Sequence, residues 1–292
     1  MLTLVETIPD DRPVLIAGPT ASGKSTLAME IVARHGGVIV NADALQVYDC
    51  WRLLTARPTA AETATVAHRL YGHVGRADPY SAGHWLREVA GILAEGRRPV
   101  IVGGTGLYFS ALTEGLAEIA PTPAAVRAEA DARLARRGLA EMIAELDAAT
   151  VAQIDLRNPA RVQRAWEVLR ATGRGLADWQ RDTGTALMPL DRAEALVLTP
   201  DRDWLARRID ARFDAMMAAG ALEEVRAELP YWQAARPSAR AIGAPELVAH
   251  LRGASTLEEA VEAAKLASRQ YAKRQRTWFR NRMRLWRPIA LP

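Results

Sequence analysis

The stretch Gly18-Pro19-Thr20-Ala21-Ser22-Gly23-Lys24-Ser25 decides the fold of this chain. An apolar run, Pro13–Ala17, precedes it and a helix-like run, Thr26–Ala33, follows it. The order of strand, glycine-bounded loop and helix, with the spacing G-x-x-x-x-G-K-[ST], is typical of a phosphate-binding loop, and a chance match is the alternative. Such a loop turns backbone N–H groups toward a phosphate at a helix N-terminus. Lys24 would supply a charge to the outer phosphate, and Ser25 could hold Mg²⁺, so the stretch predicts a di- or triphosphate site.

A carboxylate follows the second expected strand. Val38–Val40 reads as a short buried strand and leads into Asn41-Ala42-Asp43. Because the ligands of an open parallel α/β sheet lie beyond the carboxyl ends of its strands, we expect Asp43 on the same rim as the phosphate loop. An acid at that rim is a candidate base for an acceptor group that faces the phosphates. The alternative is that Asp43 caps a turn or the start of a helix.

Two more apolar runs extend the expected sheet. Pro99–Val102 ends in Gly103-Gly104-Thr105-Gly106, where the backbone can approach a ligand closely, and Glu194–Leu198 resumes the pattern. A motor-type NTPase usually has a magnesium-binding aspartate where this third strand ends in glycine, so the sequence disfavours a nucleotide-hydrolysing engine. From about residue 121 to 190, helical patterns replace strand patterns. This order predicts a helical insertion in a parallel sheet.

The last helix expected in the insertion, Pro159–Ala171, begins among cations. Asn158 is its expected N-cap, and a proline opens its first turn. Arg157, Arg161 and Arg164 cluster at this start and could contact phosphate groups. A solvated helix face is an equal alternative.

The net charge of +4 hides an asymmetry. Residues 265–292 hold nine Lys or Arg and no Asp or Glu, which leaves 29 basic against 34 acidic side chains in the other residues. This segment belongs to a long expected helix that opens at Ser255 or Thr256, and a basic face of this kind is the footprint expected for nucleic acid. The predicted fold class is α/β, with a P-loop NTPase-like parallel sheet core, an all-helical insertion domain and a basic C-terminal helix.

The composition is that of a protein with an ordinary packed core. Apolar residues make up 49% of the 292 residues and charged residues 25%. No stretch approaches the roughly 18 uncharged apolar residues of a membrane span, and Glu6, Asp10 and Asp11 precede the first strand, unlike a secretory signal. Cys50 is the only cysteine, which excludes an intramolecular disulfide and a cysteine-cluster metal site. We expect a cytoplasmic protein with no membrane partner.

Along almost its whole length the chain resembles the tRNA dimethylallyltransferases, also called tRNA isopentenyltransferases. Nine segments in the family's order carry the resemblance: Gly18–Ser25, Asp43–Tyr48, Thr55–Pro58, Asp78–Ser81, Gly103–Tyr108, Asn158–Gly173, Arg208–Phe213, Ala241–Gly243 and Lys273–Phe279. The resemblance implies a P-loop-type α/β catalytic core over residues 1–118 and 191–292. It implies that residues 119–190 form a helical insertion domain that contacts tRNA.

The resemblance also implies the reaction. A dimethylallyl group would pass from dimethylallyl diphosphate to the exocyclic amine of adenosine 37 of tRNAs, giving N6-(dimethylallyl)adenosine and releasing diphosphate. The diphosphate substrate would enter one mouth of a channel, and the adenosine, flipped out of the anticodon loop, would enter the other. Mg²⁺ would be the cofactor, with Ser25 as its protein ligand, and a monomer is the family default.

The family's functional residues map onto this sequence position by position. The implied catalytic residues are Asp43 as base, and Lys24, Ser25 and Arg212 as stabilisers of the leaving diphosphate. The implied diphosphate- or nucleotide-binding residues are Gly18, Pro19, Thr20, Ala21, Ser22, Gly23, Lys24 and Ser25. The implied tRNA-binding residues are Asp43, Ala44, Leu45, Gln46 (reading the adenine edge), Thr105, Arg127, Ala160, Arg161, Val162, Gln163 and Arg164.

The sequence departs from the family pattern at a few positions. Ala44 stands where a serine is usual, Leu54 where a glycine is usual, Arg69 where a histidine is common, and Ala244-Pro245 where Tyr-Lys is usual. Two other functions stay open. A small-molecule or nucleoside kinase would use the same loop with ATP and Asp43 as base, but leaves the basic tail without purpose. A non-catalytic RNA-binding protein with a structural nucleotide explains the tail but not the acid.

Overall fold

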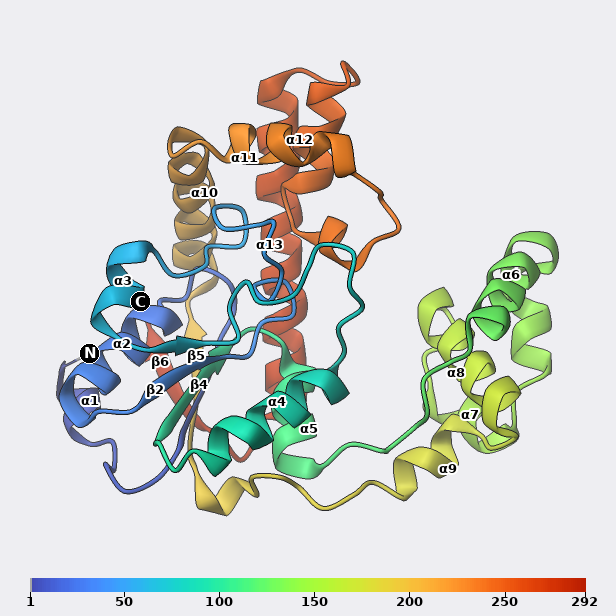
Figure 1. Cartoon of the computed structure of the whole chain (residues 1–292), viewed down its shortest axis with the longest axis horizontal. Helices are drawn as coiled ribbons and strands as arrows, with labels where there is room; N and C mark the ends of the chain where they lie inside the picture. Colours follow the sequence, from blue (N-terminus) through green and yellow to red (C-terminus); the bar gives the residue numbers. More distant parts are fainter. Residues whose placement is uncertain (1) are drawn as a thin grey trace. The chain divides into compact units, whose positions relative to one another are not determined.

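A computed structural model of the chain describes residues 2–292, and the side chains of residues 4–292 (Figure 1). The described chain divides into two compact units. The first comprises the residues up to Thr113 together with Met188–Pro292, and the second is Glu114–Leu187. The sequence predicted the insertion at residues 119–190, whereas the second unit of the structure is Glu114–Leu187. We describe each unit by itself.

The first unit is built on one six-stranded sheet, and all its strand pairs are parallel. The strands are β1 (Val14–Ala17), β2 (Val38–Asn41), β3 (His68–Arg69), β4 (Pro99–Gly103), β5 (Glu194–Pro200) and β6 (Arg287–Leu291), in the spatial order β3-β2-β4-β1-β5-β6. Ala17 lies opposite Gly103, and Asn41 lies opposite Val102, so β1, β2 and β4 end at one edge. The predicted parallel α/β core is confirmed.

The central strands are apolar runs because both faces of the sheet are covered. All residues of β1, β2 and β4 are buried, as expected for a parallel sheet between two helical layers. The sequence patterns missed β3, which has two half-buried residues, and β6, whose residues are exposed or half-buried. Both are edge strands, and Pro288 in β6 is tolerated at such an edge.

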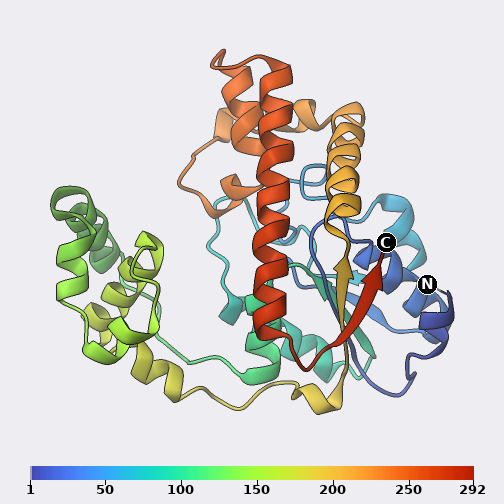
Figure 2. The same cartoon turned by 180° about the vertical axis from the view of Figure 1, so that it is seen from behind.

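Helices cover both faces of this sheet (Figures 1 and 2). The helices of this unit are α1 (Leu2–Glu6), α2 (Lys24–His35), α3 (Ala60–Thr65), α4 (Ala82–Ala94), α5 (Gly106–Glu114), α10 (Arg202–Ala218), α11 (Ala221–Glu228), α12 (Ala244–Leu251) and α13 (Leu257–Arg282), with 3-10 turns at Leu190–Arg192, Leu229–Tyr231 and Pro237–Arg240. Ile16 packs with α2, whereas Leu15 packs with α4, α5 and the end of α13. Successive side chains of a strand point to opposite faces of the sheet, so β1 contributes to two separate cores.

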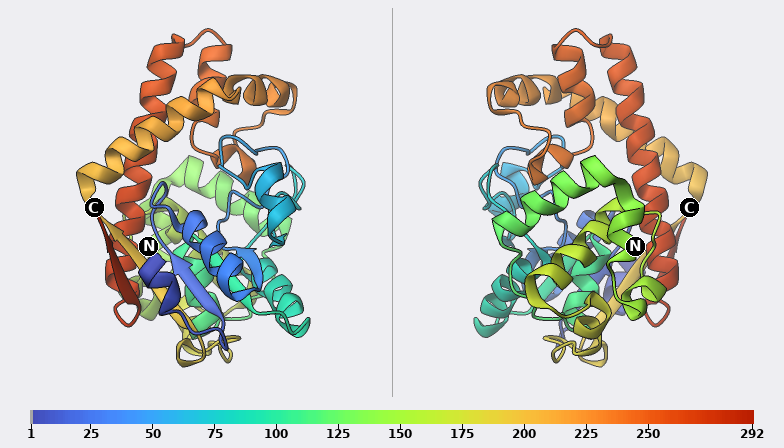
Figure 3. Two further views of the ribbon diagram at one scale, coloured as in Figure 1. Left: turned by 90° about the vertical axis from the view of Figure 1, so that its left-hand side faces the viewer. Right: turned by 90° about the vertical axis from the view of Figure 1, so that its right-hand side faces the viewer.

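The helix α13 links the sheet to a third core. Thr256 and Glu259 form a reciprocal cap at its start, which explains the predicted opening of the helix. Its first half packs with α10, α11, α12 and the segment around Trp51. Figure 2 shows α10 beside α13, and Figure 3 shows the two helices crossing. Its second half buries Phe279 against the sheet. None of the helices among the described residues could cross a membrane.

The second unit is entirely helical. Its helices are α6 (Ala124–Ala144), α7 (Ala148–Gln153), α8 (Pro159–Thr172) and α9 (Leu176–Arg181). The helix α6 has a kink at Gly138, where φ is 77°. Asn158 caps α8 as predicted, because its side chain accepts from the N–H of Arg161. Met142, Val162 and Trp166 lie in this unit's own core.

Candidate active site

The phosphate loop runs from the end of β1 to the start of α2. Gly23 and Ala21 have φ of 87° and 63°, so the loop turns through the left-handed conformation twice. A Cβ on Gly18 would lie 2.8 Å from Ser22 Oγ, which makes glycine necessary there. Ser22 is 2% exposed, and its hydroxyl has no hydrogen-bond partner within residues 4–292. The loop is therefore a tightly wound backbone cradle at a helix N-terminus.

Lys24 is the cation at the start of α2. Its Nζ donates to Pro19 O at 3.3 Å, on the opposite side of the phosphate loop. Burial lowers the pKa of Lys24 to about 8; Asp43 opposes this shift, and Arg212 adds to it. A buried amine with a single carboxylate near it is short of negative charge, and a bound anion would supply that charge.

Two arginines of α10 approach the same loop. Arg212 donates to Thr20 Oγ1, and Arg208 Nε donates to Ala21 O at 3.0 Å. Burial lowers the pKa of Arg212 to about 10; Asp43 opposes this shift, and Arg208 adds to it. The predicted Arg212 thus lies at the phosphate loop, although 187 or more residues separate the partners in sequence.

Asp43 follows β2 at the same edge. Its Oδ1 accepts from Leu45 N at 3.0 Å, and its own N–H donates to Asn41 Oδ1 at 2.8 Å. The capping alternative raised by the sequence is therefore correct for one oxygen. The other oxygen, Oδ2, accepts no hydrogen bond from residues 4–292 and lies 3.4 Å from the position of a Cβ on Gly104. Asp43 can cap its turn and still offer an oxygen to a ligand.

The glycine-rich segment after β4 closes this edge. Thr105 Oγ1 accepts from Ala44 N at 2.9 Å, which ties the segment to the Asp43 turn. The Gln275 side chain of α13 accepts from Thr20 N at 2.9 Å and donates to Gly104 O at 2.9 Å. The sequence analysis assigned no role to Gln275. The residue was noted only as part of the segment Lys273–Phe279, which resembles the family.

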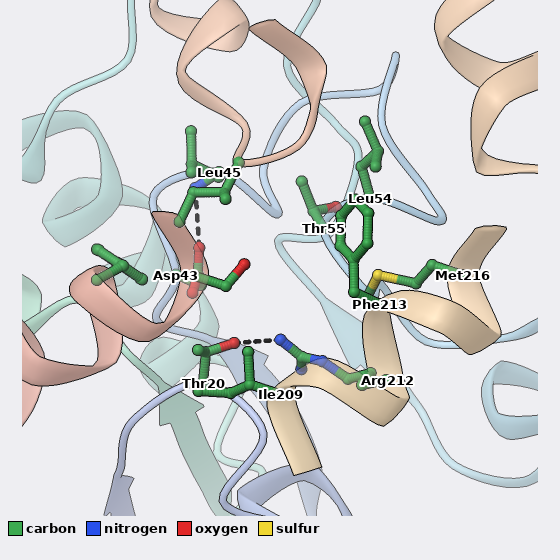
Figure 4. A pocket seen from close by; sticks show the side chains of 12 residues that line it. Thr20, Asp43, Leu45, Leu54, Thr55, Ile209, Arg212, Phe213 and Met216 are labelled. Atoms are coloured by element: carbon green, nitrogen blue, oxygen red, sulfur yellow. Dashed lines mark hydrogen bonds between the residues drawn. The ribbon is translucent and has the colours of Figure 1, made fainter. Parts of the chain in front are cut away.

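Three of these residues, Thr20, Asp43 and Arg212, line one cavity (Figure 4). Its lining is Thr20, Asp43, Leu45, Leu54, Thr55, Ile209, Arg212, Phe213, Met216, Ile242, Ser268 and Tyr271. Figure 4 shows Thr20 and Arg212 on one side, with Leu54, Thr55, Phe213 and Met216 gathered on another. An anionic head and a short apolar tail fit this division. The sequence did not predict the apolar lining, because its residues come from separate elements.

The Mg²⁺ expectation rests on Ser25. Its side chain is exposed at the start of α2 and forms no hydrogen bond within residues 4–292, so its oxygen is available to a cation. No group of three His, Cys, Asp or Glu side chains that could hold a metal occurs in the described part of the chain. The residues present fit a cation held mostly by phosphate oxygens, as in other phosphate loops.

The side-chain nitrogen of Gln46 already makes two hydrogen bonds within the protein. Its Nε2 donates to Thr55 O at 2.7 Å and to Ala56 O at 3.0 Å. Its Oε1 accepts no hydrogen bond from residues 4–292, so the oxygen is the part that could read a base edge. Ala44 and Leu45 are half-buried beside Asp43.

The remaining predicted tRNA contacts lie in the helical unit. Arg164 Nη1 donates to Thr122 Oγ1 at 2.6 Å and lies 3.9 Å from Glu167. Burial lowers the pKa of Arg164, and the nearby Arg127 adds to the shift. Ala160 and Arg161 are exposed, Val162 is fully buried, and Gln163 Nε2 donates to Asp131 and Glu167. The start of α8 therefore carries two cations, the exposed Arg161 and Arg164, which is ion-paired with Glu167.

A parallel sheet whose edge carries a phosphate loop, two buried cations and a carboxylate defines a P-loop-type group-transfer enzyme. The sequence model described as "IPP transferase" matches residues 46–282. The chain belongs to this family.

Relatives and solved structures agree with this assignment. A tRNA dimethylallyltransferase from Cereibacter sphaeroides is 76% identical and covers 98% of this chain and 91% of the relative. One from Dinoroseobacter shibae is 62% identical, covering 98% and 97%. The structure of the tRNA isopentenylpyrophosphate transferase from Bacillus halodurans is 31% identical, with a TM-score of 0.67, covering 96% and 90%. A eukaryotic dimethylallyltransferase acting on tRNA is 25% identical, with a TM-score of 0.72, covering 91% and 69%.

Proposed function

We propose that this chain transfers a dimethylallyl group from dimethylallyl diphosphate to the exocyclic amine of adenosine 37 of tRNAs. The observation that carries the proposal is the cavity, whose lining combines Thr20 of the phosphate loop, Asp43 with one carboxylate oxygen that has no partner, and an apolar wall. Family membership and the names of the relatives support the same reaction. The alternative kinase would need no apolar wall beside the acid.

The diphosphate occupies the loop. Backbone amides at the start of α2 and Lys24 Nζ contact its oxygens, and Arg212 approaches from α10. Ser25 would hold Mg²⁺ through its hydroxyl, and the ion would neutralise charge on the leaving group. The dimethylallyl group lies against Leu54 and Phe213.

The reaction is a substitution at the allylic carbon. The amine nitrogen of the flipped adenine forms a bond to that carbon, and the carbon–oxygen bond to diphosphate breaks with its electron pair on oxygen. Asp43 Oδ2 takes the proton that the amine loses, which avoids a cationic nitrogen in the product. Lys24 and Arg212 stabilise the charge that grows on the departing diphosphate, and losing one such contact typically costs about 2.7–4 kcal/mol of transition-state stabilisation.

The tRNA contacts are also part of the proposal. Gln46 Oε1 and Thr105 face the adenine, and Arg127, Arg161 and Arg164 contact phosphates of the anticodon stem-loop. Arg161 and Arg164 lie at the start of α8, and Arg127 of α6 lies close enough to Arg164 to affect its pKa. The charge of these three arginines supports this role. We place the protein in the cytoplasm as a monomer.

One assay separates this function from its alternatives. The protein is incubated with unmodified tRNA, Mg²⁺ and either dimethylallyl diphosphate or ATP, and the digested nucleosides are analysed by mass spectrometry. We expect dimethylallyladenosine with the first donor and no phosphate transfer with the second. Phosphorylated product would make the chain a kinase, and tRNA binding without either product would make it a non-catalytic binder.

A further inference from the structure

The segment 52–57 forms one isolated helical turn beside the cavity. Two backbone hydrogen bonds close it, from Arg57 N to Arg52 O at 3.0 Å and from Ala56 N to Leu53 O at 2.9 Å. Ala56 has φ of 52°, the left-handed conformation that commonly ends a helix. Leu54 and Thr55 of this turn line the cavity, so the turn sets the position of one wall.

A single helical turn is unstable by itself, because its first amides have no partner within it. Here these amides point at one carboxylate of another element, Glu224 of α11. The three bonds run from Arg52 N and Leu53 N to Oε1, at 2.6 and 2.9 Å, and from Leu54 N to Oε2, at 3.0 Å. Glu224 therefore acts as an N-cap supplied from about 170 residues away.

The other end of the turn is held as well. Its last carbonyls, those of Thr55 and Ala56, accept from Gln46 Nε2. A Cβ on Gly243 would lie 2.9 Å from the Phe213 ring and 3.0 Å from Leu54 Cδ2, so Leu54 is packed at the apolar end of the cavity. A turn fixed at both ends gives this wall a defined position.

We propose that Glu224 is a positioning residue that sets the depth of the apolar end of the cavity, and so the length of isoprenoid accepted. The inference rests on the proposed prenyl-transfer function. Glu224 touches no substrate; it acts through the turn and its Leu54 and Thr55 side chains. Without the carboxylate, the turn loses three hydrogen bonds at once and the wall is free to retreat.

The test compares two donors, dimethylallyl diphosphate and the longer geranyl diphosphate. We expect Glu224→Ala to lower the ratio of their kcat/KM values roughly tenfold, as the wall yields to the longer chain. Glu224→Gln keeps one oxygen and should lie between wild type and Glu224→Ala. The matched control is Glu223→Ala, since Glu223 is exposed and pairs with Arg226; its ratio should equal wild type. A ratio does not depend on the fraction of folded enzyme, so mere loss of stability leaves it unchanged.

Amide hydrogen exchange of Arg52, Leu53 and Leu54 tests the contact without any substrate. Exchange should be faster in Glu224→Ala than in wild type and unchanged in Glu223→Ala. An unaltered selectivity ratio or unaltered exchange in Glu224→Ala would overturn the proposal. Wild-type protein that transfers no prenyl group would refute the proposed function instead, while the exchange data would still report on Glu224.

Discussion

At the level of single residues, the site is a group of partly buried charges. Burial lowers the pKa of both Lys24 and Arg212, and the carboxylate of Asp43 counteracts both shifts. Two buried cations and one anion leave positive charge unbalanced, and a diphosphate restores the balance. The charges that bind the leaving group are thus in place before the substrate arrives.

The pKa of Lys24 gives a direct prediction about pH. Below pH 8 the free protein holds Lys24 charged, whereas above pH 8 a bound anion must recapture the proton. The Kd of inorganic diphosphate should therefore rise with pH beyond about 8, approaching about tenfold per pH unit. Titration calorimetry between pH 6.5 and 9.5 measures it. Lys24→Gln should lack this inflection, although ionisation of diphosphate affects both proteins alike; the same inflection in the variant would reject the assignment.

At the level of elements, α13 holds the two loops of the site together. Gln275 bonds to both loops, and Trp278 lies over Gly106, where a Cβ would come within 2.2 Å of its ring. Gly104 and Gly106, which follow β4, must lack a side chain because this helix approaches so closely.

The close packing of α13 predicts opposite effects of two glycine substitutions. Gly106→Ala should lower the free energy of unfolding by about 1–3 kcal/mol, because the indole is a rigid neighbour. Gly91→Ala, in α4 with no atom within 4 Å of the new Cβ, should raise it by about 0.5–1 kcal/mol. Urea denaturation measures both. Equal effects at the two positions would show that α13 does not pack there as described.

The elements also show which parts of the fold could be predicted from the sequence. The central strands and the phosphate loop were predictable because burial and spacing leave local patterns, and Asp43 followed from the rule that strand ends share an edge. The edge strands β3 and β6 were not predictable, because their residues are partly exposed and form no apolar run in the sequence. Nor were the bonds of Gln275 and Glu224, which join backbone groups far away in sequence. The apolar wall of the cavity was missed for the same reason.

At the level of the whole molecule, positive charge is distributed unevenly. On α13, Lys265 and Arg269 are paired with acidic residues of α10, whereas Lys273, Arg276 and Arg280 have no ion pair within the described chain. In the helical unit, Arg161 is exposed, and Arg164 shares its charge with Glu167. Unpaired cations are the ones whose contact with phosphates releases counterions.

This distribution predicts a graded dependence of tRNA binding on salt. Arg161→Gln should reduce the slope of log affinity against log salt by about one, and Arg164→Gln by less, because Glu167 already neutralises part of its charge. Fluorescence anisotropy with labelled tRNA over several salt concentrations gives the slopes. Arg226→Gln, whose charge Glu223 pairs, is the control. Slopes that are equal in all three variants would remove the insertion from the tRNA interface.

The most direct test of the account concerns the unpartnered oxygen of Asp43. Asp43→Asn keeps an oxygen for Leu45 N but removes the base, so only the chemistry should change. The measurement is the single-turnover rate of dimethylallyl transfer with saturating tRNA and donor, together with the Kd for tRNA. We predict a rate lower by roughly 10²–10⁴-fold with the Kd unchanged. A rate near that of wild type would contradict the central claim that this carboxylate accepts the proton of the attacking amine.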